Sequence, residues 1–233
     1  MPSPLSHISQ IFIDLRAKGL AHPHERPEGQ RSRVLLADSK LDAFLGGGLP
    51  CGGITEIFGC VSSGRTTLAQ MLISAATRAG ELAAWIDLPN AFDPNGADTA
   101  GVDLGRMLWV FPSNRIAAVR VAEQVLDVGG FRVVVLDLNT PSVERLTVPS
   151  SAWLRISRVA ARRDAAIVVL TATNSVGAFA TMSLEVRAGR RVFAGNRGPC
   201  PIFAEATSAL RVQRCRFGIS GEVAFELVAS PSA

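Results

Sequence analysis

The chain has 233 residues, of which 48% are hydrophobic and 19% are charged, and its formal charge is +4. This length suits one domain, or one domain with a small appendage, and the composition excludes wholesale disorder. No apolar run reaches the roughly 18 residues of a membrane span, and the N-terminus lacks the basic-then-apolar layout of a signal peptide. We therefore expect a cytoplasmic protein without a membrane partner.

The N-terminal part differs in character from the rest. Residues 5–20 place apolar side chains near helical spacing, which predicts a short amphipathic helix. Residues 21–33 contain prolines and a glycine among polar residues and predict a linker. We expect an arm over residues 1–33, a core over 34–229 and a tail over 230–233. The helix packs either on a neighbouring molecule or on its own domain, and the pattern leaves both open.

Downstream of residue 34, short apolar runs alternate with helical segments. The runs expected to be strands are ITEIF (54–58), ELAAWID (81–87), RMLWVF (106–111), FRVVVLD (131–137) and AAIVVLT (165–171). The segments expected to be helices are 66–79, 115–128 and 151–163. This alternation indicates an α/β fold with a central, mainly parallel sheet and helices on both faces. Beyond residue 183, SLEVR, SALRVQRCRF and EVAFELV indicate antiparallel strands joined by glycine-rich turns.

The stretch GCVSSGRTT, residues 59–67, lies between an expected strand and an expected helix. Backbone N–H groups converge at such a helix N-terminus and form a nest for phosphate. The spacing G-x-x-x-x-G-R-T matches a P-loop apart from its arginine. The residues of this stretch expected to bind nucleotide are Gly59, Ser62, Ser63, Gly64, Arg65, Thr66 and Thr67. A plain strand-turn-helix without a ligand is the alternative.

Two residues are expected to hold Mg²⁺ beside the phosphates. Thr66 occupies the position whose hydroxyl usually binds the ion. Asp137 ends an apolar strand, where a carboxylate holds Mg²⁺ beside a P-loop. The strand end alone is a weak signal, since many buried strands end at a polar residue. Together with the loop it predicts a nucleotide site that takes ATP and Mg²⁺.

Arg65 stands where a P-loop has lysine. Lysine brings a compact charge to the β and γ phosphates, whereas guanidinium is wider, planar and prefers a forked approach. We expect phosphate binding to survive this change better than turnover. Only Lys18 and Lys40 of the 24 basic residues are lysine, so an arginine at this position is less surprising here than in most chains.

Residues 34–229 resemble the RecA recombinase family. The motifs that carry the resemblance are LDAFLGGGLP, EIFG, SSGRTT, the strand end ID and AFDP. They all precede residue 95, and the match is looser over the rest of the chain. The resemblance implies a RecA-like P-loop NTPase core with ATP and Mg²⁺ as its cofactors.

The same resemblance bears on catalysis. The family has a water-activating glutamate two residues after the strand end ID, and here that place holds Pro89. Proline offers neither an acid nor a base, so we assign no catalytic residue. Asp87 and Asp93 lie nearby as substitutes, although Asp93 matches a structural residue of the family's turn. The expected outcome is ATP binding with weak or absent hydrolysis.

Members of the family bind DNA through two loops, one after the strand that ends at Asp137 and one after strand 165–171. Here the second loop reads TATNSVGAFATMS, with no Lys or Arg and with Phe179 as its one aromatic residue. Neutralisation of phosphates dominates affinity for DNA. A loop without basic residues therefore disfavours recombinase-style DNA wrapping.

Positive charge gathers elsewhere in the sequence. Residues 187–216 carry several arginines against the single acid Glu205. A cluster of this kind suits nucleic acid or an acidic partner. Its members are Arg187, Arg190, Arg191, Arg197, Arg211, Arg214 and Arg216. The alternative is a solvated outer face of the C-terminal strands in an arginine-rich protein.

Short RecA-like proteins with altered catalytic residues are similar to the ImuA type, which are accessory proteins to an error-prone Y-family polymerase in damage-induced translesion synthesis. This finer resemblance rests on the size of the chain and on its changed motifs. It implies an ATP-binding accessory factor of DNA repair that contacts a Y-family polymerase, a RecA-type protein or single-stranded DNA. Two alternatives stay open: an active DNA-dependent ATPase of recombinase type, and a structural adaptor with a vestigial nucleotide site.

The family also assembles into filaments in which the N-terminal arm docks on the next subunit. By this resemblance residues 1–20 are expected to join copies of the chain into a homo-oligomer. The linker 21–33 differs from that of the family, so the resemblance covers the arm less well than the core.

Overall fold

The structure of the chain is a computed structural model that describes residues 14, 17, 32–140, 148–194 and 202–228. Asp14 and Ala17, within the expected helix 5–20, are helical and exposed. The rest of that helix, most of the expected linker 21–33 and the tail 230–233 lie outside the described residues. The division of the chain into arm, core and tail therefore stays a prediction.

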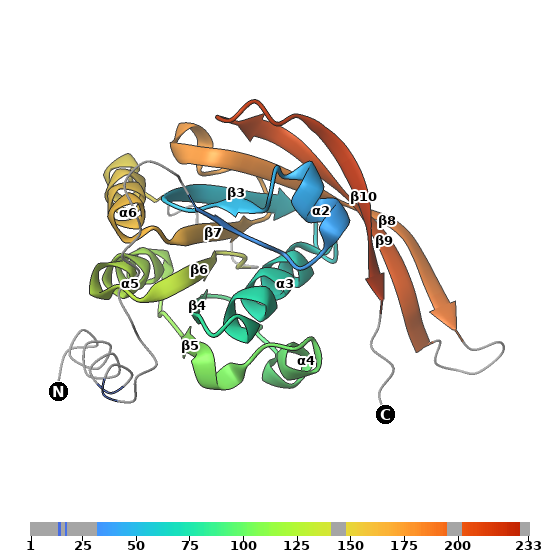
Figure 1. Cartoon of the computed structure of the whole chain (residues 1–233), viewed down its shortest axis with the longest axis horizontal. Coiled ribbons are helices and arrows are strands. Elements are labelled where there is room, and N and C mark those ends of the chain that lie inside the picture. Colours follow the sequence, from blue (N-terminus) through green and yellow to red (C-terminus); the bar gives the residue numbers. More distant parts are fainter. Residues whose placement is uncertain (1–13, 15–16, 18–31, 141–147, 195–201, 229–233) are drawn as a thin grey trace.

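Eight strands form one sheet in the order β10-β9-β8-β3-β7-β6-β4-β5 (Figure 1). They are β3 Gly53–Gly59, β4 Leu82–Asp87, β5 Met107–Val110, β6 Phe131–Asp137, β7 Ala166–Thr171, β8 Ala180–Ala194, β9 Ile202–Cys215 and β10 Gly221–Val228. Neighbours from β8 to β5 pair in parallel, whereas β9 is antiparallel to both β8 and β10. A small separate pair is formed by β1 Arg33–Val34 and β2 Leu49–Pro50.

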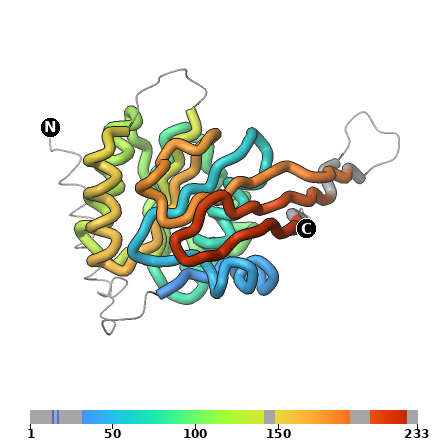
Figure 2. The backbone as a smooth tube through the Cα atoms, turned by 90° about the horizontal axis from the view of Figure 1, so that it is seen from above, coloured from blue at the N-terminus to red at the C-terminus, as the bar shows by residue number. Residues whose placement is uncertain are grey.

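Helices cover both faces of the sheet, and α5 and α6 lie side by side on one of them (Figure 2). The helices are α2 Ser39–Phe44, α3 Arg65–Arg78, α4 Pro94–Thr99, α5 Arg115–Val128 and α6 Ser150–Arg163, with short 3-10 turns η1 Leu104–Arg106 and η2 Gly177–Phe179. One apolar core includes Leu41 of α2 and Leu72 of α3, and the other includes Val125 of α5 and Ile156 of α6. Within the described ranges no helix is long and apolar enough to cross a membrane.

The predicted α/β class is confirmed, with its mainly parallel sheet and its antiparallel C-terminal strands. Helix 115–128 and strand 131–137 have the predicted bounds, and the other predicted elements of the parallel region differ by one residue at one or both ends. The short helices α2 and α4 were not predicted. Each has 6 residues and begins at a side-chain cap, Asp38 or Asp93, rather than in a periodic apolar pattern.

The C-terminal strands are longer than predicted. β8 has 15 residues and β9 has 14, and together they extend beyond the parallel part of the sheet (Figures 1 and 2). β8 lies parallel to β3 with Gly59 opposite Val186, and the chain continues past this point along β8. The strand pair therefore runs directly beside the loop that follows β3.

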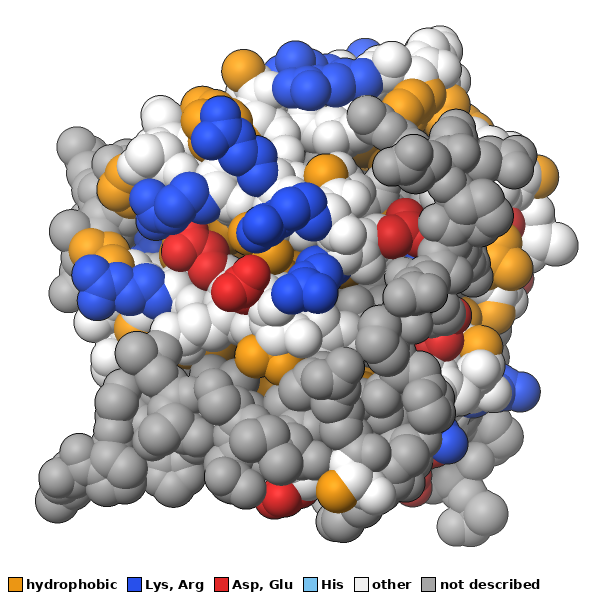
Figure 3. Space-filling model, turned by 60° about the vertical axis from the view of Figure 1, so that its left-hand side comes forward, with side chains coloured by type: hydrophobic (Ala, Val, Ile, Leu, Met, Phe, Trp, Pro, Cys, Tyr) orange, Lys and Arg blue, Asp and Glu red, His pale blue; other side chains and the backbone are white. Residues whose placement is uncertain are grey.

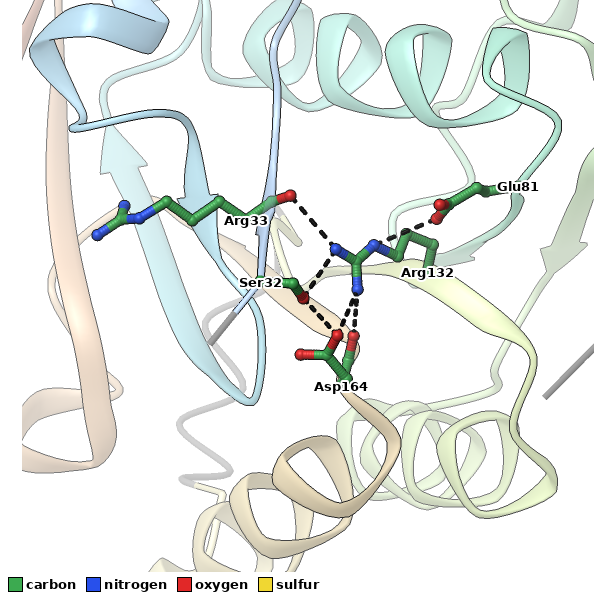
Figure 4. Close-up of polar contacts among 5 residues, drawn as sticks. All are labelled: Ser32, Arg33, Glu81, Arg132 and Asp164. Atoms are coloured by element: carbon green, nitrogen blue, oxygen red, sulfur yellow. Dashed lines mark hydrogen bonds and ion pairs between the residues drawn. The ribbon is translucent and has the colours of Figure 1, made fainter. Parts of the chain in front are cut away.

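A buried ion network joins four parts of the chain at the edge of the sheet where β6 begins (Figure 4). The guanidinium group of Arg132, whose side chain is 3% exposed, pairs with Asp164 at 2.9 Å and with Glu81 at 3.2 Å. It also donates to the hydroxyl of Ser32 at 2.8 Å and to the carbonyl of Arg33 at 3.3 Å. Arg132 thus ties the entry of the chain into the core to the starts of β4, β6 and β7.

Replacing Arg132 by Met should lower the free energy of unfolding by about 3 kcal/mol, because it removes the buried cation with which both Asp164 and Glu81 pair. Urea denaturation of the variant and the parent measures this loss. The matched control is Arg162→Met, because Arg162 pairs with Asp127 where both side chains are 68% exposed. That exposed pair should contribute less than about 1 kcal/mol. Equal losses in the two variants would contradict the structural role of Arg132.

Candidate nucleotide-binding site

The loop between β3 and α3 has the path of a phosphate nest. Gly64 at the N-cap of α3 has φ 102°, a left-handed conformation that favours glycine. A Cβ atom on Gly59 would lie 2.1 Å from the carbonyl oxygen of Val186, so only glycine allows this approach to β8. The two glycines of the sequence motif are therefore required by the backbone itself.

The N-terminus of α3 offers donors to an anion. The first N–H groups of this 14-residue helix have no intrahelical partner, and no side chain caps them. Next to them the hydroxyl of Ser63 is buried and has no hydrogen-bond partner among the described residues. Thr66 is exposed in the first turn, and Ser62 is exposed in the loop. This set fits phosphate oxygens, with a free threonine hydroxyl beside them for a divalent cation.

The C-terminal strands hold the loop from the opposite side. The hydroxyl of Ser208 on β9 donates to the carbonyl of Ser63 at 2.8 Å. The guanidinium group of Arg191 on β8 donates to the carbonyl of Ser62 at 3.1 Å. Both bonds engage carbonyl oxygens, which would repel an anion, and leave N–H groups for a ligand. The position of the nest thus depends on strands that lie well outside the P-loop motif.

Arg65 turns toward the carboxyl ends of β6 and β7. Its side chain is buried, and Nη1 donates to Oδ1 of Asn139 at 2.5 Å and to the carbonyl of Thr171. Burial lowers the pKa of Arg65, and the nearby Asp137 opposes this effect. The guanidinium group therefore bridges the loop to two strand ends while its other N–H groups stay available.

Asp137 lies at the same strand edge. It is 5% exposed, and its Oδ1 accepts hydrogen bonds from the backbone N–H of Asn139 at 3.0 Å and from the Asn139 amide at 2.8 Å. Burial raises the pKa of Asp137 to about 6, and Asp87 raises it further, while the Asn139 bonds and Arg65 act in the opposite direction. Both described bonds go to Oδ1, which leaves Oδ2 as an acceptor toward a metal ion or its water.

Asp87 and Asp93, the two acids near Pro89 that were considered as a general base, both accept hydrogen bonds from the protein. Asp87 is 1% exposed and accepts hydrogen bonds from the N–H groups of Ala91 and Phe92 and from Nε1 of Trp109, at 3.0 to 3.2 Å. Asp93 caps α4 by accepting the N–H of Asn95. A carboxylate that already accepts several donors is poorly placed to take a proton from water.

A cavity of about 300 Å³ opens beside the loop. It is lined by Val61 and Arg65, by Asn139 after β6, by Thr171 and Ser175 after β7, and by Arg115. Arg115 was not among the predicted site residues. The sequence could have indicated it, because Arg115 begins a predicted helix at the carboxyl edge of a parallel sheet, and ligands bind at that edge.

The loop after β7 is held by Glu56, which the sequence analysis also missed. Glu56 on β3 is fully buried, and its Oε1 accepts the N–H groups of Ser175 at 2.6 Å and Val176 at 2.9 Å. Two arginines of β9 and the following turn, Arg214 and Arg216, donate to the carbonyls of Gly177 and Ala178. The segment that resembles a DNA-binding loop is therefore bonded along its length to the sheet.

The predicted arginine patch is spread along β8 and β9. Arg187 pairs with Glu185 at 2.9 Å and lies 3.9 Å from Glu222. Arg190 and Arg211 are exposed, and Arg197 lies outside the described residues. Together with the contacts of Arg191, Arg214 and Arg216, most of the described members bond to the protein itself. Their part in nucleic-acid or partner binding stays a prediction.

Exposed arginines also lie on another surface. Figure 3 shows basic side chains around acidic ones on the face that carries α5 and α6. Arg155 pairs with Glu123 at 2.9 Å there, and Arg162 lies 3.6 Å from Asp127. This surface indicates that exposed arginines are a general property of the chain, which favours the alternative of a solvated face for β8 and β9.

Comparison with known proteins identifies the family. Residues 28–151 match the model of the RecA N-terminal domain, and this range contains both the loop and Asp137. The chain belongs to the RecA family. The RecA motifs quoted from the sequence all lie in this range, whereas β7 to β10 follow it.

Individual RecA proteins agree with this result. Protein RecA of Rubrobacter xylanophilus is 36% identical over 142 residues, which cover 60% of this chain and 41% of that protein. Protein RecA of Acidothermus cellulolyticus is 37% identical over 150 residues, covering 57% and 44%. Protein RecA of Cytophaga hutchinsonii is 43% identical over 98 residues, covering 42% and 28%. The chain thus spans less than half the length of these RecA relatives.

The raised pKa of Asp137 predicts a pH-dependent stability. Between pH 4 and pH 6 the folded state binds more protons at Asp137 than the unfolded state, so stability falls as the pH rises through this window and stays lowered above it. Asp137→Asn should therefore raise the free energy of unfolding at pH 8 by about 1–3 kcal/mol, the lost attraction to Arg65 reducing the gain. Urea denaturation at pH 8 and pH 4.5 measures the effect.

The increase in the free energy of unfolding in Asp137→Asn should shrink toward pH 4.5, where the carboxyl of the parent protein is itself protonated. Asp98→Asn serves as the control, because Asp98 is exposed on α4 and makes no side-chain bond among the described residues. A variant Asp137→Asn less stable than the parent at pH 8 would show that the carboxylate is stabilised rather than strained by its surroundings.

Proposed function

We propose that the chain is a RecA-like accessory protein of DNA repair that binds MgATP and hydrolyses it weakly or not at all. The observation that carries the proposal is a loop whose geometry suits phosphate, followed by an α3 N-terminus without a side-chain cap. The acids nearest to Pro89 already accept hydrogen bonds from the protein. These two features support binding of the nucleotide with slow turnover.

Nucleotide binding is supported by the local geometry of the nest. Free N–H groups, the unpartnered hydroxyl of Ser63 and the exposed Thr66 surround the N-terminus of α3. Thr66 and Asp137 would hold Mg²⁺, and Arg65 would add positive charge beside the phosphates. When bound, the ion supplies charge neutralisation between the terminal phosphates.

Weak hydrolysis is supported by the surroundings of the position where the family has its base. Pro89 has no titratable group, and Asp87 is committed to three donors. General-base catalysis contributes about 10²–10⁴-fold to such reactions, so its absence favours slow turnover even where the nucleotide binds well.

The biological setting follows from the family and stays part of the proposal. The similar proteins are RecA proteins, which supports a place in DNA repair and self-association. We propose a cytoplasmic translesion-synthesis role of ImuA type, with a Y-family polymerase or a RecA-type protein as the partner. Single-stranded DNA would bind through exposed arginines such as Arg190 and Arg211, and residues 1–20 would join copies of the chain.

Two other functions compete with this one. A working DNA-dependent ATPase is supported by the retained Gly59, Gly64, Thr66 and Asp137, and requires a base from another residue or another subunit. A structural adaptor with a vestigial site is supported by the bonds of Arg65 to Asn139 and Thr171, which place its guanidinium group away from open solvent. The three functions differ in nucleotide binding and in phosphate release.

Calorimetric titration with MgATP, with phosphate release followed on the same sample, separates these functions. We expect MgATP to bind, Thr66→Ala and Asp137→Ala each to weaken binding at least about tenfold by removing the groups that hold the metal ion, and phosphate release to stay at background. Thr99→Ala, an exposed threonine on α4, is the control and should bind like the parent.

Each competing function has its own signature. Phosphate release that rises with single-stranded DNA and disappears in Asp137→Ala would establish the ATPase. Absence of binding, with no change in melting temperature, would establish the adaptor, because a ligand that binds only the native state raises its stability. Strand exchange by the purified chain would overturn the accessory role.

A further inference from the structure

Arg115 occupies a position that the P-loop motif does not explain. It is the first residue of α5, and the preceding Asn114 fixes this turn by accepting the N–H of Ala117 at 2.9 Å. Nη2 of Arg115 donates to the carbonyl of Leu138 at 3.3 Å. Leu138 directly follows Asp137, so this contact holds the guanidinium group next to the residue that would bind the metal ion.

The cavity that Arg115 lines has the character of an anion site. Its volume is about 300 Å³, and it also contains Arg65 and the polar side chains of Asn139, Thr171 and Ser175. No carboxylate is found among the described residues that line it. Asp137 and Glu56 lie behind this wall, bonded to Asn139 and Ser175. The charged groups in the lining itself are the two guanidinium groups, which suit phosphate rather than a metal ion.

The two arginines differ in how far the protein uses them. Arg65 is buried and its Nη1 serves two protein acceptors, so its position is fixed. Arg115 is half-exposed, makes no ion pair among the described residues and has one long hydrogen bond there. A guanidinium group carries five N–H donors in a fork that matches phosphate oxygens. Arg115 is therefore the less constrained of the two arginines and has more donors left for a ligand.

We infer that Arg115 binds the terminal phosphate of a nucleoside triphosphate and makes the site select triphosphate over diphosphate. The inference rests on the proposed nucleotide binding. In a P-loop the nest holds the inner phosphates, and the metal ion bridges the β and γ phosphates. The third phosphate then lies on the side of Asp137, which is the side where Leu138 anchors Arg115.

This assignment explains how the site works without a lysine. Arg65 bridges the loop to β6 and β7, and Arg115 approaches the same cavity from α5 on the other side of the strand end. The charge that a P-loop lysine delivers to the outer phosphates is thereby divided between two arginines from different helices. Arg115 is a specificity-determining residue for the ligand and takes no part in proton transfer.

The test compares MgATP and MgADP binding by calorimetry in the parent and in Arg115→Gln. We expect the variant to bind MgATP about tenfold more weakly and MgADP within about twofold of the parent, because one charge-assisted contact to the third phosphate is lost. Arg120→Gln is the matched control: Arg120 is exposed on the same helix, outside the cavity lining, and should leave both affinities unchanged.

The outcomes separate this inference from the proposed function. If the parent binds both nucleotides and Arg115→Gln changes neither affinity, or weakens both equally, the inference is wrong and nucleotide binding stands. If the parent binds neither nucleotide, the proposed function fails, and the shift of the unfolding temperature with tripolyphosphate decides the anion site alone. A shift that Arg115→Gln abolishes supports the site, and a shift that is absent or unchanged overturns it.

Discussion

Parallel pairing at one edge of the sheet is the constraint on which the candidate site depends. β3, β7, β6 and β4 run in the same direction, so their carboxyl ends meet. The register places Phe58 opposite Thr171, and Asp137 opposite both Leu170 and Asp87. The loop after β3, the carboxylate of Asp137 and the groups that accept from Arg65 therefore come together because of the strand pairing alone.

That same edge sets the electrostatics of the site. Asp87 and Asp137 end adjacent strands, and both are nearly inaccessible to water. Burial is the main reason why the pKa of Asp137 rises, and the nearby Asp87 raises it further. Asp87 is stabilised by three donors, and Arg65 offsets part of the repulsion at Asp137. A bound divalent cation would complete this compensation.

The parallel core could be predicted from the sequence because apolar strands and amphipathic helices have distinct periods. The glycines of the loop could be predicted because the local backbone conformation requires them. It was insufficient for contacts between elements far apart in the chain. In the sequence Glu56 is simply one polar residue in an apolar strand. Only the fold shows that its Oε1 accepts the N–H groups of Ser175 and Val176 after β7. In the sequence Arg191 is part of a basic cluster, yet in the fold it donates to the carbonyl of Ser62 in the loop after β3.

A site of this composition would favour binding over reaction. Fixed guanidinium and N–H groups interact with phosphate oxygens in the ground state as well as in the transition state, and such uniform binding tightens the complex without lowering the barrier. Acceleration requires a group that acts on the attacking water, and Asp87 is held by Trp109 and by the turn that contains Pro89. Freeing that carboxylate would expose a buried charge and break the turn. The arrangement that stabilises the end of β4 would thus also keep Asp87 from acting as a base, and a nucleotide held in such a site would act through the conformation that it stabilises rather than through its cleavage.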